Sequence, residues 1–304
     1  MKRTILIGLC LALLLCACIQ PGRVHALTPL EPDHICSLTL HYTQDGLGFE
    51  GLSVRIYRVA EAFPDGTFEL VAPFSGYPVN IHGITSQKEW QDVASTLKAY
   101  VAADQVEPTA VATTDETGTA VWENLQTGLY FVHGVIAEKE SGTYQFNDFM
   151  VYLPTPLEGE GFDYDVEAVP KCTQFIPNTH FSLVKLWKDA GNEQDRPKSV
   201  TVDILKDGQL HETVVLSQEN NWSYNWTVPE GTEVWTVVER DVPAGYTVSI
   251  SENGYAFVIT NTKTNPVDPP VTGDVFPLWL LTSSLCISGF AIILLSTWRE
   301  RKRT

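Results

Sequence analysis

Three polar residues stand at positions in the C-terminal half of the chain where the strand pattern predicts apolar ones. They are Lys185, Glu239 and Asn261, and each is flanked two positions away by a large apolar residue. Because side chains two apart on a strand share a face, we expect all three to point into the protein core. An unpaired charge is costly there, so a pKa shift that neutralises the group is favoured.

Neutralisation would make these residues reactive. A lysine that loses its proton on burial is a nucleophile. A carboxyl group in the same apolar pocket has a raised pKa and can shuttle protons. Such an amine can attack an asparagine side-chain carbonyl, release ammonia and leave an isopeptide bond. The alternative is a buried Lys185–Glu239 ion pair capped by Asn261, with no covalent bond. Lys188 is a weaker amine candidate because it has the opposite strand parity.

Cysteines offer a second possible covalent tie. Of the six, four lie in apolar segments near the two ends of the chain, and only Cys36 and Cys172 lie between these segments. Free thiols are disfavoured outside the cell, so we expect an intradomain disulfide between Cys36 and Cys172. Closing a loop of that size would stabilise the fold by roughly 4–5 kcal/mol. The alternative is two cysteines that are unpaired or paired between molecules.

The N-terminal segment has the pattern of an export signal. Residues 1–26 contain a basic start followed by an apolar stretch that is too short to span a bilayer comfortably. We expect cleavage before Leu27, which leaves residues 27–35 as a short N-terminal segment. Lipoprotein processing at Cys18 is the alternative.

The C-terminal segment has three parts. Residues 264–274 form a proline-rich linker, residues 275–298 are apolar enough to predict a transmembrane helix, and residues 299–304 form a basic tail expected on the cytoplasmic side. This order places residues 27–270 outside the cell. A membrane anchor without further processing is one interpretation.

The same tripartite layout resembles the cell-wall sorting signal of Gram-positive surface proteins. The resemblance implies a sortase motif made of Pro269, Pro270, Val271, Thr272 and Gly273. In that family a sortase cleaves between the threonine and the glycine and joins the threonine carbonyl to an amine. The family usually has leucine where this chain has Pro269, which leaves the sortase class open. The implied location is the cell surface, anchored to the wall, or to the membrane if sortase does not act.

Composition narrows the function classes. The formal net charge of −17 argues against nucleic acid and anionic membrane surfaces as partners. The seven histidines are scattered, and the sequence has no metal-spaced cluster, phosphate-binding glycine loop or Ser/His/Asp motif. We therefore expect no metal, no cofactor and no enzyme activity beyond a single-turnover maturation step.

Both halves of the exported region are predicted to consist mainly of strands. Alternating apolar and polar residues at 200–204, 222–226 and 257–259 indicate half-buried strands separated by Gly-containing turns. The one convincing helix follows Ser86, which forms a capping box with Glu89. Its apolar stripe predicts an insertion that closes one side of a sandwich.

These segments resemble a known family. The stretches VKLW, RPKSVTVDILKDG, NNWSYNW, WTVVERDVPAGY and FVITNT are similar in order to a Cna B-type domain. The resemblance implies a β-sandwich over residues 176–263, with Lys185 as the amine, Asn261 as the acceptor and Glu239 as the catalyst. Residues 36–172 resemble the N-terminal domain of sortase-assembled pilins. We therefore expect an all-β chain of two tandem Ig-like sandwiches, the first with a helical insertion.

A lysine near the end of the first domain is a candidate for polymerisation. The stretch VEAVPKC, which contains Lys171, resembles the pilin motif, in which a lysine attacks the sortase-bound threonine of the next subunit. Val169 and Cys172 depart from that motif. The leading hypothesis is a pilin or wall-anchored stalk whose partners are sortase and peptidoglycan or neighbouring pilin subunits, with a membrane contact through the C-terminal helix before processing. The alternative is a monomeric adhesin with an unknown host ligand.

Overall fold

The computed structural model describes residues 30–157, 161–177 and 179–264 of the 304-residue chain. The expected signal peptide, sortase motif, transmembrane helix and basic tail lie outside these residues. Within the described ranges, no helix is long and apolar enough to cross a membrane.

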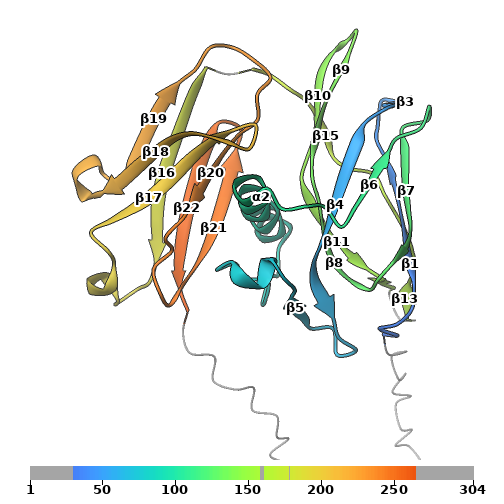
Figure 1. The fold of residues 1–304 in the computed structure, drawn as a ribbon, viewed down its shortest axis with the longest axis horizontal. Coiled ribbons are helices and arrows are strands. Elements are labelled where there is room, and N and C mark those ends of the chain that lie inside the picture. Colours follow the sequence, from blue (N-terminus) through green and yellow to red (C-terminus); the bar gives the residue numbers. More distant parts are fainter. Residues whose placement is uncertain (1–29, 158–160, 178, 265–304) are drawn as a thin grey trace, which may run out of the picture. The chain divides into compact units, whose positions relative to one another are not determined.

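The first β-sandwich is built from strands that precede residue 175 (Figure 1). One sheet has the order β14-β1-β7, in which β1 pairs with β14 in parallel and with β7 in antiparallel orientation. The facing sheet has the order β11-β8-β4-β5, with β6 also paired to β4, and a third sheet has the order β15-β10-β9. The strand bounds are β1 Cys36–His41, β4 Ser53–Ala62, β5 Phe68–Leu70, β6 Ala110–Thr113, β7 Thr119–Leu125, β8 Gly128–Val132, β9 Val135–Lys139, β10 Gly142–Phe146, β11 Phe149–Leu153, β14 Asp165–Ala168 and β15 Cys172–Gln174.

Two short pairs of strands and one turn of 3-10 helix complete this half. The pairs are β2 with β3 and β12 with β13. Their bounds are β2 Thr43–Gln44, β3 Leu47–Gly48, β12 Thr155–Pro156 and β13 Phe162–Asp163, and the 3-10 turn η1 covers Phe74–Gly76.

The second β-sandwich follows after residue 178 and has two sheets. The larger has the order β19-β16-β22-β21, and the smaller has the order β18-β17-β20. The first and last strands, β16 and β22, lie side by side and run parallel. The bounds are β16 His180–Lys188, β17 Ser199–Lys206, β18 Gln209–Ser217, β19 Ser223–Thr227, β20 Trp235–Glu239, β21 Tyr246–Asn253 and β22 Ala256–Lys263, with 3-10 turns η2 Glu193–Asp195 and η3 Gln218–Asn220.

Helix α2, Gln87–Asp104, begins where the sequence predicts it. The side chain of Ser86 accepts a hydrogen bond from the Glu89 backbone N–H, and the Glu89 carboxylate accepts one from the Ser86 backbone N–H. This reciprocal capping satisfies two backbone donors that the first helical turn would otherwise leave unpaired. The capping box is therefore confirmed.

The surroundings of helix α2 differ from the expectation. It packs on β11 and β8 of the first sandwich, and more extensively on β21 and β20 of the second. All residues from Val93 to Val101 are buried, including the polar Thr96 and Lys98. An apolar stripe predicts only one buried face, and here polar side chains fill the other. The described residues up to Lys263 consequently form one compact unit that holds both sandwiches.

The expected all-β class is confirmed. Strand β17 contains the predicted segment 200–204, and β22 contains the predicted segment 257–259. The turn between β17 and β18 is formed by Asp207 and Gly208, both with positive φ, as a tight hairpin with right-handed strand twist requires.

Candidate functional site

The three polar residues singled out from the sequence meet in the core of the second sandwich. Lys185 lies on β16, Asn261 on the adjacent β22, and Glu239 at the end of β20 in the facing sheet. Their exposed fractions are 2% for Lys185 and 0% for both Glu239 and Asn261. The strand parity argument therefore placed all three side chains correctly. Lys188, of opposite parity, is exposed.

Strand pairing and aromatic packing position the amine. In the parallel register of β16 and β22, Lys185 is opposite Ile259, and Trp187 is opposite Asn261. The Lys185 Nζ atom lies 4.1 Å from the centre of the Trp187 ring. Trp187 in turn packs edge-on against Trp222, with ring centres 5.5 Å apart. This apolar wall limits the ways in which water could solvate the amine.

One carboxyl group contacts both of its neighbours. Glu239 Oε2 lies 3.6 Å from Lys185 Nζ, and Glu239 Oε1 accepts a hydrogen bond of 2.8 Å from Asn261 Nδ2. The amine also donates to the backbone carbonyl of Leu186 at 3.0 Å. Glu239 therefore bridges the amine and the amide that the sequence analysis proposed as reaction partners.

Burial favours the uncharged forms of the two ionisable groups. It lowers the pKa of Lys185 to about 8, even though the nearby Glu239 carboxylate acts in the opposite direction. Burial also raises the pKa of Glu239, against the opposing effect of Lys185. A stable ion pair would shift both pKa values the other way. Burial therefore makes the neutral amine and the protonated carboxyl group easier to reach than they would be in water.

Two unsatisfied atoms agree with this protonation state. Glu239 Oε2 and Asn261 Oδ1 are buried and have no hydrogen-bond partner among the described residues. Unpaired buried acceptors are costly. A proton on Glu239 Oε2 would supply the donor that both atoms lack, and the carboxyl and amide groups could then pair through two hydrogen bonds.

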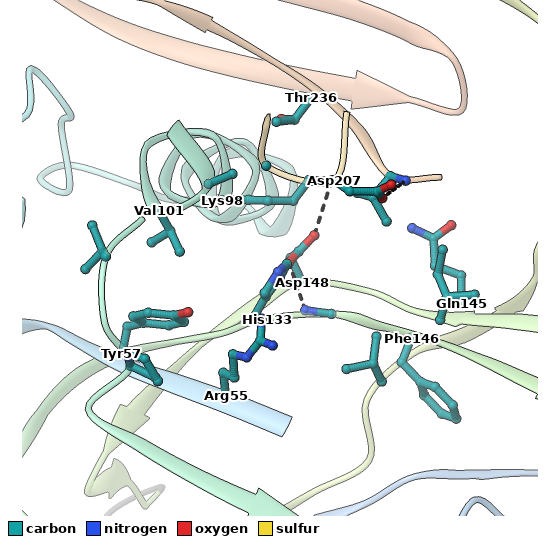
Figure 2. Close-up of a pocket in the computed structure, with 18 of the residues that line it drawn as sticks. Arg55, Tyr57, Lys98, Val101, His133, Gln145, Phe146, Asp148, Asp207 and Thr236 are labelled. Carbon is teal, nitrogen blue, oxygen red and sulfur yellow. Dashed lines mark hydrogen bonds and ion pairs between the residues drawn. The ribbon is translucent and has the colours of Figure 1, made fainter. Parts of the chain in front are cut away.

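A second buried lysine provides an internal comparison. Lys98 on α2 lies 2.7 Å from Glu252 Oε2 on β21. It also lies 3.6 Å from Asp148 Oδ2 (Figure 2). Burial alone would lower the pKa of Lys98, but the two carboxylates raise it above its ordinary value. This lysine is therefore a charged ion-pair partner, unlike Lys185. Sequence periodicity gave no signal for it, because Lys98 occupies a helix face predicted to be exposed.

The Lys98 cluster joins the two sandwiches. The Asp148 carboxylate also pairs with His133 Nδ1 at 2.8 Å and accepts from the Gly134 backbone N–H at 2.8 Å. Figure 2 shows His133, Asp148 and Lys98 beside a cavity of about 760 Å3. Burial would raise the pKa of Asp148, but Lys98 and His133 lower it to about 2. The cluster is a structural ion-pair network, and the described residues contain no group of His, Cys, Asp and Glu side chains suited to hold a metal ion.

The structure does not pair the two cysteines. Cys36 and Cys172 are both free thiols, the first buried and the second half-buried. In the parallel register of β1 with β14, Cys36 precedes the first matched residue and Cys172 follows the last by four positions. Cys172 begins β15, which pairs with β10 in a different sheet from β1. The expected Cys36–Cys172 disulfide is thus not formed in this structure.

Lys171 is exposed, as a reactive amine on a surface would need to be. It lies between β14 and β15, and its backbone carbonyl accepts a hydrogen bond of 3.0 Å from Asn147 N–H. The neighbouring Val169 is 64% exposed, and Pro170 is buried. The loop is therefore held by its backbone while its side chains at 169 and 171 face solvent.

The first sandwich has Gly134, after strand β8, at the position that corresponds to Glu239. At Gly134, a Cβ atom would lie 2.4 Å from the backbone oxygen of Phe146, so no side chain fits there. The strand that corresponds to β16 carries Leu38 and Leu40 as its fully buried residues. Within the described residues, the three-residue site belongs to the second sandwich alone.

The second sandwich matches a known domain family. Residues 181–262 match the family model of the Cna protein B-type domain. A collagen adhesin of Staphylococcus aureus is 25% identical over 159 residues, which cover 46% of this chain. The chain spans only 13% of that adhesin's length.

Solved structures to which the chain is similar include Cna repeats and pilins. A single B repeat unit of the Staphylococcus aureus collagen-binding surface protein is 16% identical, with a TM-score of 0.27, and covers 76% of this chain and all of its own. The T6 backbone pilin of serotype M6 Streptococcus pyogenes is 13% identical, with a TM-score of 0.33, over 77% of this chain and 64% of its own.

Proposed function

We propose that this chain, in which residues 181–262 form a Cna B-type domain, is a structural cell-surface protein, either a sortase-assembled pilin or a wall-anchored stalk. Its second sandwich is closed by an isopeptide bond between Lys185 and Asn261. The observation that carries this proposal is the single buried carboxyl group of Glu239, which reaches both the amine and the amide.

The proposed reaction balances within the three residues. The neutral Lys185 amine attacks Cγ of Asn261, and the Nζ–Cγ bond forms as the Cγ–Nδ2 bond breaks. Glu239 carries a proton from Nζ to Nδ2, the atom that its other oxygen already contacts, and Nδ2 leaves as ammonia. Glu239 ends in its starting state, so it acts as the catalyst of a single turnover.

The position of the bond suits a protein under tension. Strand β16 begins the second sandwich, and β22 ends it and leads toward the proposed sorting motif. Force applied at the two ends of this sandwich would shear the parallel pair β16–β22. A covalent bond between these strands would carry that force in place of backbone hydrogen bonds.

Intact-mass measurement of the recombinant protein tests this proposal. We expect a mass lower by one ammonia than the sequence predicts, and the full mass for Lys185→Met, Glu239→Ala and Asn261→Ala. Lys188→Met, which changes a neighbouring exposed lysine, is the matched control and should still lose ammonia. The unmodified mass in the wild-type protein would refute the isopeptide bond.

The assembly proposal uses a second pair of residues. A sortase thiolate attacks the Thr272 carbonyl and displaces the Gly273 amine, and the resulting thioester is then attacked by a Lys171 amine of another subunit or by a peptidoglycan amine. The exposure of Lys171 supports the first outcome. Immunoblots of wall extracts should show a high-mass ladder that Lys171→Ala abolishes, whereas a single band of subunit size would contradict polymerisation.

A monomeric adhesin is the second candidate. The observation that favours it is the match to a collagen adhesin over 159 residues. In that case the wall extract would contain only the single band, and the purified protein would bind an extracellular-matrix protein directly.

A further inference from the structure

A mostly apolar groove borders Lys171 in the first sandwich. Its volume is about 710 Å3, and its lining comes from β5, β11, the start of α2 and the loop before β15. Besides Lys171, its main apolar contributors are Phe68, Ile84, Trp90, Met150, Tyr152 and Val169. We call this surface the Lys171 groove. It lies apart from the Lys185 site and has no role in the isopeptide reaction.

The groove is lined by apolar side chains that pack against the core on one side and are partly exposed on the other. Trp90, Met150 and Tyr152 pack with one side against the main hydrophobic core but stay only half-buried. Phe68 and Tyr152 meet edge-on, with ring centres 4.8 Å apart. Val169 is 64% exposed. Contiguous apolar surface of this kind, held in place by core packing, is typical of a binding site.

The chain itself contains a segment of suitable chemistry. Residues 265–272 read NPVDPPVT, with three prolines and two valines. Proline-rich segments adopt the extended polyproline II conformation, lose little entropy on binding and dock into grooves lined by aromatic side chains. At about 3.1 Å per residue, eight residues span roughly 25 Å. Because prolines lack N–H donors, strand addition to β11 is the less suitable mode.

We propose that the Lys171 groove binds residues 265–272 of a second copy of this chain. The inference rests on the proposed function, in which Thr272 of one subunit is joined to Lys171 of the next. A bond at Lys171 would fix Thr272 beside the groove, so that the preceding prolines and valines lie along Trp90 and Met150. The groove would thus orient the incoming threonine before transfer and shield the junction afterwards.

A peptide-binding experiment tests the groove independently of sortase. The probe is the synthetic peptide NPVDPPVT, and the protein ends at Thr264, since residues up to Lys263 form one compact unit. NMR titration should shift the indole signal of Trp90, assigned with Trp90→Phe. Val169→Asp should weaken binding about tenfold, the ratio expected for replacing one buried aliphatic contact. Val121→Asp, at a valine that is 49% exposed on β7, is the matched control and should bind as the wild type does.

The outcomes separate this inference from the assembly proposal. Thr272→Ala in the full chain should abolish the wall ladder, whereas the protein ending at Thr264, which lacks that residue, should still bind the peptide NPVDPPVT. A ladder in the wild type, together with no Trp90 shift or equal binding by Val169→Asp and Val121→Asp, would overturn the groove and leave polymerisation standing. Peptide binding without a ladder would refute polymerisation but not the groove. A protein ending at Thr272 that shows the Trp90 shift at every protein concentration would indicate that the segment binds its own chain, contrary to the proposal.

Discussion

Replacing Lys98 by methionine should destabilise the chain by breaking the ion-pair network between the sandwiches. Methionine keeps most of the length and apolar volume of the lysine stem, so the main loss is the charge. The change leaves Asp148, 7% exposed, without its cation, and it removes the 2.7 Å contact to Glu252. Breaking a buried pair by removing one partner typically costs about 3–5 kcal/mol.

The remaining contacts of Asp148 and the partial exposure of Glu252 make the expected cost of losing Lys98 smaller than this. Asp148 keeps His133 and the Gly134 N–H as donors, and the Glu252 side chain is 24% exposed. The fall of the Asp148 pKa from 3.8 to about 2 corresponds to about 2–3 kcal/mol of stability, at 1.36 kcal/mol per unit. We therefore expect Lys98→Met to lower the free energy of unfolding by about 2–3 kcal/mol at pH 7.

The effect should depend on pH in a defined direction. Since the pKa of Asp148 is lowered by folding, its contribution is complete above pH 4 and disappears as the pH falls toward 2. The pKa of Lys98 is raised by folding, so Lys98 stays charged and contributes its full stability at neutral and acidic pH. That contribution is lost only when its carboxylate partners become protonated. The difference between wild type and Lys98→Met should therefore shrink between pH 5 and pH 2.

Urea unfolding followed by tryptophan fluorescence measures this difference. The matched control is Lys206→Met, which removes the cation of the exposed Lys206–Glu233 pair and should cost at most about 1 kcal/mol. A Lys98→Met stability equal to that of Lys206→Met, or a difference that stays constant from pH 5 to pH 2, would refute the ion-pair interpretation.

Two further predictions concern the first sandwich. In the folded protein without reductant, an alkylating reagent should modify Cys172 well before Cys36. The reason is that Cys36 is 1% exposed and burial raises the pKa of its thiol to about 11. Mass spectra in which neither thiol is modified, even after unfolding, would instead indicate a disulfide. Gly134→Ala should lower the free energy of unfolding by about 2 kcal/mol or more, since its Cβ would lie 2.4 Å from the Phe146 oxygen. Gly76→Ala, which has open space around the new methyl group, should change stability by less than about 0.5 kcal/mol, and equal effects at the two glycines would contradict the steric argument.

Much of the reactive site could be predicted from the sequence because strands have a strict period of two. Lys185, Glu239 and Asn261 each follow that period from an apolar neighbour, and all three are buried. Periodicity could not show that Glu239 touches both of the others, since that depends on how the two sheets face each other. Nor could it place Trp187 over the amine, because an aromatic residue on a strand is usually part of the core.

The missed features share a cause, which is that they depend on contacts between distant parts of the chain. Helix α2 has one apolar stripe, but its polar face is buried because Thr96 accepts from the Ile250 N–H and Lys98 meets Glu252, both on β21. The disulfide was expected from composition and compartment alone. In the structure Cys36 and Cys172 are both free thiols.

The most direct test of the central claim is to isolate the crosslink itself. Proteolysis of the purified protein followed by tandem mass spectrometry should yield a branched peptide in which Lys185 and Asn261 are joined and one ammonia is absent. Fragment ions should place the junction on these two side chains. Recovery of the two segments only as separate, unmodified peptides would contradict the proposal that the neutral amine and the protonated Glu239 complete their reaction.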